Sequence, residues 1–514
     1  MNYADLFRVT LPETALEVAA LLVLVVDLGL LRKAALNLRI GVATLLGVIG
    51  CGVAQWTIAH QTLIGLSDTS GNMVLVAGGS AAVAQAGILG LTVLSLFLLI
   101  DSTFTRHAGE FVAVMLMAAT GGLLIAAAQD LLVIFVGLEL LSLGLYILTA
   151  FAKQSGKSAE SAMKYYLFGG MSAAFLLFGF SYLYGITGST NLHQVMVGLY
   201  RSNAVQAAPL LYIALVMIVA GLGFKVAAVP FHLWAPDAYE GAPAPAAAFI
   251  ASVSKVASFA LLISIGTAAW HMFDGAPMRV SIHAGFVARP QPVYLGFLVA
   301  WPELLMVLAA VSMVVGNLAA LAQTSVRRLL AYSAIAHAGY MLLGLAFFSY
   351  GPRSAQAILY YILTYGLTTV GAFGVVAVVE RAAGSDKMDA FLGLSKRNPL
   401  LAGVLLVLFL SLAGIPPLVG FWAKFNLFAA VLGVYPVGAG LGLVILAVGL
   451  SAVSLYYYLQ VLKRAYVMPA VDNTPLKVHP LTMLVLLVIA AGVVVLGCFP
   501  ALLQGWIASF YTSM

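Results

Sequence analysis

Charged residues are scarce in this sequence. Of its 514 residues, 8% are charged and 63% are hydrophobic, and the mean hydropathy is +1.07. A soluble domain carries about 25% charged residues, so the composition excludes that class of protein. The sequence predicts an all-α polytopic membrane protein.

Cysteine and cofactor-binding motifs are also missing. The two cysteines, Cys51 and Cys498, lie far apart in apolar segments, which excludes a thiolate metal cluster and argues against a disulfide framework. There is no Walker motif, no G-x-G-x-x-G at a strand–helix junction, no C-x-x-C and no H-E-x-x-H. We therefore expect no cofactor or metal in this chain. The net charge of +6 does not indicate nucleic-acid binding, because in a membrane protein the placement of basic residues matters more than their sum.

Apolar runs long enough to cross a bilayer, about 20 residues each, recur along the whole chain. We expect about fourteen transmembrane helices, at 12–31, 39–58, 78–100, 110–128, 130–150, 160–186, 208–229, 242–269, 293–320, 328–349, 355–380, 399–433, 437–462 and 479–504. No loop is long enough for a soluble domain, so residues 1–514 form a single membrane domain. The heavier positive charge follows the first run and no cleavage site closes it, which indicates a transmembrane helix and not a signal peptide.

The basic residues of the loops are unevenly divided between the two sides of this topology. With the N-terminus outside, 15 lie in inner loops: Arg32, Lys33, Arg39, Arg106, Lys153, Lys157, Arg327, Arg328, Arg381, Lys387, Lys396, Arg397, Lys463, Arg464 and Lys477. Five lie outside: Arg8, Arg201, Arg279, Arg289 and Arg353. This bias follows the positive-inside rule and places both termini outside.

Charged side chains also fall within the apolar runs, namely Glu139, Lys164, Lys225, Lys255 and Lys424. A charge at the bilayer centre costs roughly 2.5–3.5 kcal/mol on insertion scales, so these groups are expected to face the protein interior or a hydrated path. Such residues are functional by default. Lys164 lies near the inner end of its run, where it either snorkels to the headgroups or forms a buried ion pair with Glu139.

Two of the lysines accompany breaks in the apolar runs. Lys225 precedes Pro230 by five residues, and Lys424 follows Pro416-Pro417. Proline removes a backbone donor, and the freed carbonyls are tolerated at membrane depth only within protein or beside water. The two breaks lie five spans apart, which is typical of inverted repeats. We expect three N-terminal helices in about 1–105, one repeat in 106–270, an inverted repeat in 290–465, and a C-terminal helix in 466–514.

Lys255 and His337 complete a set of polar groups at membrane depth. Lys255 lies about thirteen residues into its run, roughly 20 Å deep, where Ser252, Ser254 and Ser258 offer hydroxyls. His337 lies between the two breaks in the sequence and shares a helical face with Ser333. It either packs as a satisfied buried histidine or serves as a titratable link. Since burial disfavours the charged form of an ammonium group, we interpret the set as a proton relay.

Five segments together resemble the antiporter-like subunits of respiratory complex I, NADH-quinone oxidoreductase. They are GFKVAAVPFHLWAPDAYEGAPAPAAAFIASVSKVASFA, GLELLSLGLYIL, AMKYYLFGG, QTSVRRLLAYSAIAHAGYMLLGL and GIPPLVGFWAKF. PFHLWAPDAYEGAP is similar to the N-type subunits, and Lys424 also fits that type, since M-type subunits have a glutamate there.

The resemblance implies a proton-translocating membrane-arm subunit. Glu139 and Lys164 match the modulating pair of the family, Lys225 the input lysine, Lys255 the central lysine and Lys424 the output residue. His337 matches a position that is often polar. The flavin (FMN), iron–sulfur clusters and quinone of the family belong to other subunits. The resemblance also implies K- and M-type neighbours and a bacterial inner membrane, with both termini on the periplasmic side.

Three other interpretations remain open at this stage. A Mrp-type cation/proton antiporter subunit shares the fold and the lysines, although the N-type wording at 230–243 disfavours it. A structural scaffold with vestigial charges is disfavoured because every lysine of the relay is present. An equivalent subunit of a related quinone-reducing or hydrogenase complex is not distinguished, because the electron donor is not visible in this chain.

Overall fold

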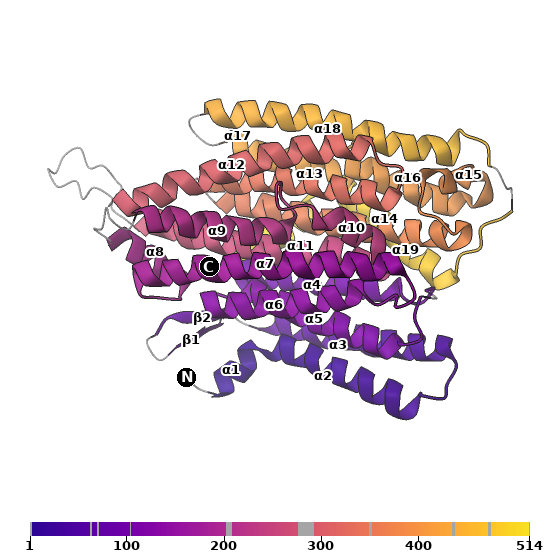
Figure 1. Cartoon of the computed structure of the whole chain (residues 1–514), viewed down its shortest axis with the longest axis horizontal. Helices are drawn as coiled ribbons and strands as arrows, with labels where there is room; N and C mark the ends of the chain where they lie inside the picture. Colours follow the sequence, from indigo (N-terminus) through magenta and orange to yellow (C-terminus); the bar gives the residue numbers. More distant parts are fainter. Residues whose placement is uncertain are drawn as a thin grey trace.

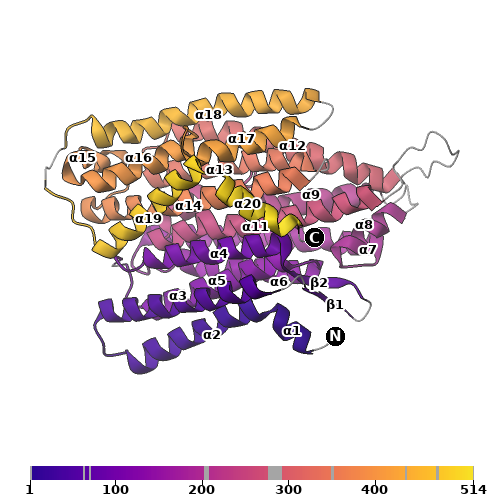
Figure 2. The ribbon, with the colours of Figure 1, turned by 180° about the vertical axis from the view of Figure 1, so that it is seen from behind.

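The computed structural model describes residues 3–61, 64–68, 71–102, 104–201, 208–275, 292–348, 352–433, 437–470 and 474–512. These residues form an elongated bundle in which the axes of most long helices lie roughly along its longest dimension (Figures 1 and 2). A short antiparallel hairpin, β1 (Ile64–Ser67) with β2 (Met73–Ala77), lies at one end of the bundle. The expected all-α class is confirmed.

The helices of the first half are α1 (Tyr3–Val9), α2 (Leu11–Val25), the π-helical turn η1 (Val26–Leu30), α3 (Leu36–His60), α4 (Gly79–Phe97), α5 (Ala108–Ala127), α6 (Leu131–Thr149), α7 (Gly156–Thr187), α8 (Leu192–Arg201), α9 (Ala208–Val226), α10 (Trp234–Gly241) and α11 (Ala244–Gly275). Those of the second half are α12 (Pro292–Leu321), α13 (Val326–Ala346), α14 (Pro352–Ala383), the 3-10 turn η4 (Met388–Phe391), α15 (Leu394–Arg397), α16 (Pro399–Ala413), α17 (Val419–Leu432), α18 (Val437–Tyr466), α19 (Pro480–Cys498) and α20 (Ala501–Thr512).

Within the described residues, 12 helices are long and apolar enough to cross a membrane, so the chain is a multi-pass membrane protein. Each coincides with one of the expected spans. The expected span at 12–31 is α2 continued by η1, and the span at 399–433 is α16 and α17 separated by a break. The count of fourteen and the two inverted repeats remain predictions.

The centre of the bundle is formed by α11, α13 and α14, whose apolar stretches are almost wholly buried. Small residues let neighbouring helices approach closely, which is how membrane helices pack without a hydrophobic driving force. Where α13 crosses α12, for example, a Cβ on Gly316 would lie 2.6 Å from the backbone nitrogen of Ala336. In contrast, fewer than half of the residues in the apolar stretches of α3, α7, α18 and α19 are buried. The charged groups of the central helices are therefore shielded from lipid.

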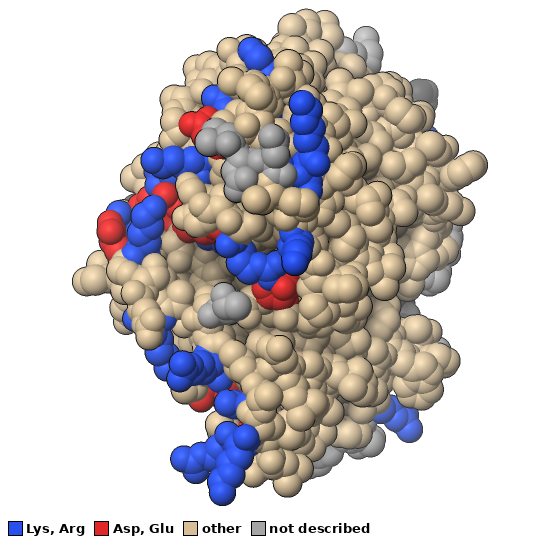
Figure 3. Space-filling view, turned by 90° about the vertical axis from the view of Figure 1, so that its right-hand side faces the viewer, with Lys and Arg blue, Asp and Glu red and all other residues tan. Residues whose placement is uncertain are grey.

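The two ends of the bundle differ in charge. Both termini lie toward the end that carries the hairpin (Figures 1 and 2). Lys and Arg side chains gather on the opposite end, which Figure 3 shows face-on. The predicted arrangement, with both termini on the side that has fewer basic residues, agrees with this distribution. Arg279 and Arg289, expected on the termini side, lie outside the described residues, as does the predicted boundary at 270–290 beyond Gly275.

Candidate functional site

The first predicted break is confirmed at the end of α9. The helix ends at Val226, and Ala227 has a positive φ of 59°. The turn that follows is satisfied by hydrogen bonds: Val229 N donates to Ser312 Oγ of α12 at 2.9 Å, and Ala228 N donates to the Gly223 carbonyl at 2.8 Å. Backbone groups at membrane depth are thus paired within protein, as a break there requires.

Lys225 lies in the last turn of α9 and is buried, with 9% of its surface exposed. Its Nζ donates to Ser142 Oγ of α6 at 2.5 Å and lies 3.9 Å from Glu139 Oε1, also on α6. A cation at a helix C-terminus is additionally stabilised by the helix dipole. The structure therefore pairs Glu139 with Lys225.

Lys164 is not the partner of Glu139, which corrects the expected Glu139–Lys164 pair. Its Nζ instead lies 2.7 Å from Glu160 Oε1, one turn earlier on α7, and 2.9 Å from Asp237 Oδ2 on α10. The Lys164 side chain is 43% exposed, so the alternative that it reaches the inner end of its helix describes it better than a buried pair does. Snorkelling of the long side chain places its charge beside the Asp237 carboxylate of α10.

Lys255 is deeply buried, at 1% exposure. Its Nζ donates to the Ala334 carbonyl of α13 at 2.6 Å and lies 5.9 Å from the ring centre of Tyr365 on α14. The nearby serines do not bind it. Each donates its hydroxyl to its own helix, Ser252 to Ala248, Ser254 to Ile250 and Ser258 to Ser254. This back-bonding satisfies a hydroxyl in a helix interior locally, and a part for these serines in the relay stays a prediction.

His337 on α13 is buried between aromatic side chains. Its Nδ1 lies 2.8 Å from Tyr361 Oη of α14, so the hydrogen-bond requirement of one ring nitrogen is met. Its ring centre lies 4.9 Å from that of Tyr365 and 5.8 Å from that of Tyr340. The same Tyr365 ring lies near Lys255 Nζ. His337 and Lys255 therefore share an aromatic neighbour.

The second predicted break lies between α16 and α17, and Lys424 spans it. Lys424 Nζ donates to the carbonyls of Ala413 at 2.8 Å and Leu412 at 3.2 Å, the last residues of α16, and to Ser451 Oγ of α18 at 2.7 Å. Carbonyls at a helix C-terminus lack partners within the helix. The Lys424 ammonium donates hydrogen bonds to these carbonyls and interacts favourably with the dipole of α16.

Lys424 is also linked to His337. Its Nζ lies 5.5 Å from the ring centre of Tyr340, which is a second aromatic neighbour of His337. A cavity of about 10 Å³ is lined by His337, Tyr361, Tyr365, Ser411 and Leu412. A space of this size with polar walls is close to the minimum that holds one water molecule. The structure thus brings Lys255, His337 and Lys424 together across three helices.

Lys225 and Lys255 form separate clusters, because within the described residues their hydrogen-bond partners do not overlap.

Sequence reasoning missed Tyr361 and Tyr365, which connect the second cluster. They stand four residues apart in YYILTYGLTT, an unusually polar stretch of an apolar run. That spacing puts them on one helical face. It is the pattern in the sequence from which their place in the site could have been predicted.

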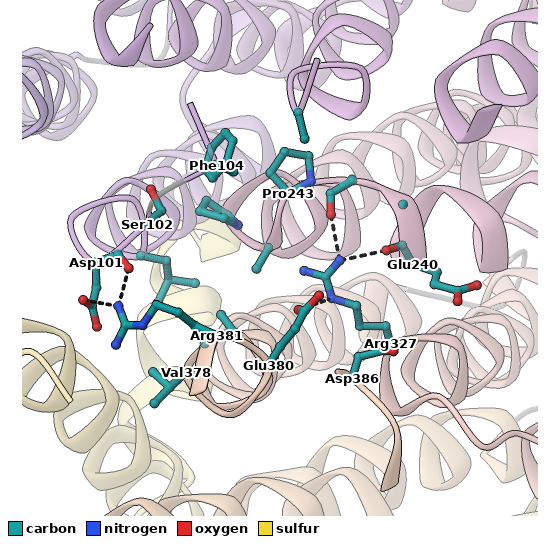
Figure 4. A pocket seen from close by; sticks show the side chains of 18 of the residues that line it. Asp101, Ser102, Phe104, Glu240, Pro243, Arg327, Val378, Glu380, Arg381 and Asp386 are labelled. Atoms are coloured by element: carbon teal, nitrogen blue, oxygen red, sulfur yellow. Dashed lines mark hydrogen bonds and ion pairs between the residues drawn. The ribbon is translucent and has the colours of Figure 1, made fainter. Parts of the chain in front are cut away.

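A charged cavity of about 340 Å³ lies at the basic end of the bundle, between the ends of several helices (Figure 4). Arg381 contacts Asp101 on one side of it. On the other side Arg327 of α13 lies 3.1 Å from Glu380 of α14, and its Nη1 donates to the carbonyls of Glu240 and Ala242 at 2.8 Å each. The cavity therefore lies at the end of the bundle where the Lys and Arg side chains gather (Figure 3).

Comparison with known proteins gives a consistent family. A family model described as "NADH:quinone oxidoreductase/Mrp antiporter, TM" matches residues 128–282 and 272–454. NADH-quinone oxidoreductase subunit N 2 of Acidobacterium capsulatum is 48% identical, with 99% of each chain covered. A chain of respiratory complex I from Thermus thermophilus has a TM-score of 0.75 and 32% identity, covering 96% of this chain and 98% of that one. A chain of the Mrp complex from Dietzia, at TM-score 0.79 and 21% identity, covers 98% of this chain and 52% of that one, and this likeness concerns the fold alone.

Proposed function

Since the chain belongs to the subunit N family of NADH-quinone oxidoreductase, we propose that it is a proton-translocating subunit of the membrane arm of such a complex. Electron transfer from NADH to quinone takes place in other subunits, which hold the flavin, iron–sulfur clusters and quinone. This chain contributes a path for protons and no redox group of its own. Protons move along the axis of Glu139, Lys225, Lys255, His337 and Lys424, with Lys164 modulating its first part.

The observation that carries this proposal is the placement of His337 between two lysines. Tyr365 lies beside Lys255 and Tyr340 beside Lys424, and the histidine ring packs against both tyrosines. Each lysine has its ammonium on backbone carbonyls, and neither has a carboxylate at ion-pair distance among the described residues. Buried ammonium groups without counter-charges favour loss of a proton. A neutral imidazole between them accepts on one nitrogen and donates on the other.

The first part of the axis supplies a way to drive the second. Two unit charges 4 Å apart interact by about 4 kcal/mol at an effective dielectric of about 20, and Lys225 and Glu139 lie near that distance. Moving one proton against 100 mV requires about 2.3 kcal/mol. Opening this ion pair removes more stabilisation from the Lys225 ammonium than that amount, which is enough to force a proton from Lys225 toward the centre of the membrane. Closing the pair favours uptake of the next proton.

The surroundings of the chain follow from the same proposal. We infer K- and M-type subunits as neighbours and a bacterial inner membrane as the location. Both termini would lie on the periplasmic side, because they lie at the end opposite the cluster of basic residues and basic residues favour the cytoplasmic side. The Pro-rich turn after Lys225 then faces the cytoplasm, so Lys225 takes up protons and Lys424 releases them.

The experiment compares Lys255→Met with Lys463→Met, an exposed lysine of α18, in the complete complex. The complex is isolated in mild detergent through a tag on this chain and reconstituted into vesicles. We expect flavin and iron–sulfur absorbance to co-purify with the chain, and we expect Lys255→Met to reduce NADH-driven acidification at least tenfold while Lys463→Met pumps normally. A flavin-free assembly, or normal pumping by Lys255→Met, contradicts the proposal.

A further inference from the structure

The structure departs most clearly from the expected Glu139–Lys164 pair in the position of the Lys164 side chain. Its ammonium is held by Asp237 of α10 at 2.9 Å and by Glu160 at 2.7 Å, while Glu139 is paired with Lys225. The Glu160 side chain is 64% exposed and that of Asp237 is 25% exposed. An exposed ion pair one turn apart on a helix contributes little. Asp237 is therefore the partner that fixes where the charge of Lys164 lies.

Asp237 is itself part of a network that joins two helices. Its Oδ1 accepts from Arg328 Nη1 of α13 at 2.7 Å, while its Oδ2 accepts from Lys164 of α7. Glu240, one turn later on α10, repeats the arrangement, accepting from Arg328 at 3.0 Å and from Lys157 of α7 at 3.2 Å. Each carboxylate of α10 thus bridges a lysine of α7 and the same arginine of α13.

Arg327, the residue before Arg328, holds the other side of α10. Its guanidinium donates to the Glu240 and Ala242 carbonyls at the C-terminus of the helix, and Glu380 of α14 lies against it (Figure 4). A cation at this end of a helix satisfies carbonyls that have no partner within the helix. We call the set Lys157, Lys164, Asp237, Glu240, Arg327 and Arg328 the α10 clamp.

The clamp acts on the segment that follows the break at Lys225. Trp234, the first residue of α10, donates its Nε1 to the Phe224 carbonyl at 2.9 Å, directly before Lys225. The Trp234 ring also stacks on Tyr165, the neighbour of Lys164, with ring centres 4.2 Å apart. On the α13 side, Arg328 precedes His337 by nine residues, about 13 Å along the helix. A shift of α10 is therefore transmitted to Lys164, to Lys225 and to α13.

We propose that Asp237 is a positioning residue of the proton relay, which holds Lys164 on α10 and so leaves Glu139 to Lys225. In this proposal two lysines compete for the half-buried carboxylate of Glu139, and Asp237 decides the competition by giving Lys164 another counter-charge. Movement of α10 releases Lys164, which then draws Glu139 away from Lys225. This inference rests on the proposed function and assigns to α10 the step that switches the Glu139 pair.

The test is a double-variant cycle of Asp237→Asn and Lys164→Met in the whole complex, with proton transport per NADH oxidised as the readout. We expect Asp237→Asn alone to lower this ratio about threefold or more. In the Lys164→Met background it should have no further effect, because Asp237 acts through Lys164. Asp237→Glu should restore transport, and the matched control Glu160→Gln should change the ratio less than twofold.

A purely structural role for Asp237 predicts a different pattern. Loss of assembly lowers the amount of complex and leaves the number of protons moved per NADH unchanged. In the double variant, the reduction in the amount of complex would then multiply with any reduction that Lys164→Met causes on its own. Independent effects, or an unchanged ratio in Asp237→Asn, overturn the inference. If Asp237→Asn fails to assemble, Lys164→Gln cuts the same pair from the exposed side without disturbing Arg328, and an unchanged ratio there overturns it equally. Normal pumping by Lys255→Met would instead contradict the proposed function, so the two failures are distinguishable.

Discussion

Lys225 Nζ lies 3.9 Å from Glu139 Oε1 and 2.5 Å from Ser142 Oγ, which joins the end of the broken helix α9 to α6. The serine is the hydrogen-bond partner and the glutamate is the counter-charge. Because these two roles belong to different residues, the carboxylate is able to leave without stripping Lys225 of its hydrogen bond. The pair is thus suited to open and close.

Replacing Glu139 by Gln preserves its shape and removes this counter-charge. We expect proton transport by the reconstituted complex to fall about tenfold, since one unit of log rate corresponds to about 1.4 kcal/mol and the pair is worth more than that. Dye-monitored acidification alongside NADH oxidation measures it. Glu17→Gln, at an exposed glutamate of α2, is the control and should pump normally. Equal pumping by both variants would contradict a role for Glu139.

Replacing His337 by Phe removes the group that packs between the two tyrosines. Transport should fall on the order of tenfold or more, because a benzene ring carries no proton between Lys255 and Lys424. Tyr361→Phe loses only the hydroxyl 2.8 Å from His337 Nδ1, and a single hydrogen bond contributes about 1 kcal/mol, so its defect should be smaller. His193→Phe, at an exposed position of α8, serves as control. Full transport by His337→Phe would show that the ring is only packing.

Gly414, the residue after α16, tests the second break. Its φ is 89°, and a Cβ there would lie 3.0 Å from Lys424 Cδ and 3.2 Å from Nζ. Gly414→Ala should therefore cost about 1–2 kcal/mol for the left-handed conformation and also displace the lysine. We expect a lower melting temperature of the purified complex together with weaker pumping. Gly403→Ala is the control, because its Cβ meets nothing within 4 Å; a similar loss there would refute the local explanation.

The α10 clamp should be insensitive to pH in the neutral range. Burial alone would raise the pKa of Asp237, but hydrogen bonds from Lys164 and Arg328 outweigh it and hold the pKa below its ordinary value. The neighbouring Glu240, bonded to Arg328 and Lys157, behaves likewise. A lowered carboxyl pKa gives stabilisation that is complete above about pH 4 and is lost only as the pH falls through the folded-state value.

The transport defect of Asp237→Asn should therefore be constant between pH 6 and 8, whatever the pH profile of the unaltered complex. Measuring the ratio of the two rates across this range tests the point. A defect that disappears toward pH 6 would mean that Asp237 is already protonated there, against the geometry of its two cationic neighbours, Lys164 and Arg328.

The sequence was sufficient to predict those features whose free-energy cost depends on local sequence alone. A lysine or a proline inside an apolar run is unfavourable wherever the run packs, which is why both breaks and the burial of Lys255 were predictable. The partner of Lys164 was not, because Asp237 lies 73 residues away and the choice between two carboxylates depends on how α10 packs. The partner of Lys255 is a backbone carbonyl 79 residues distant. Because every residue has a backbone carbonyl, the sequence does not indicate which one accepts from the lysine.

The three acceptors around Lys424 have a consequence for its release of a proton. As an ammonium the group has three hydrogens, matching the Ala413 and Leu412 carbonyls and Ser451 Oγ. As an amine it has two hydrogens and a lone pair. The Ser451 hydroxyl, which donates to the Ala413 carbonyl at 3.4 Å while it accepts from the ammonium, is then free to turn and donate to the lone pair of the nitrogen, since the two amine hydrogens serve the two carbonyls. The orientation of one serine hydroxyl on α18 thus records whether the last lysine of the axis is loaded or empty.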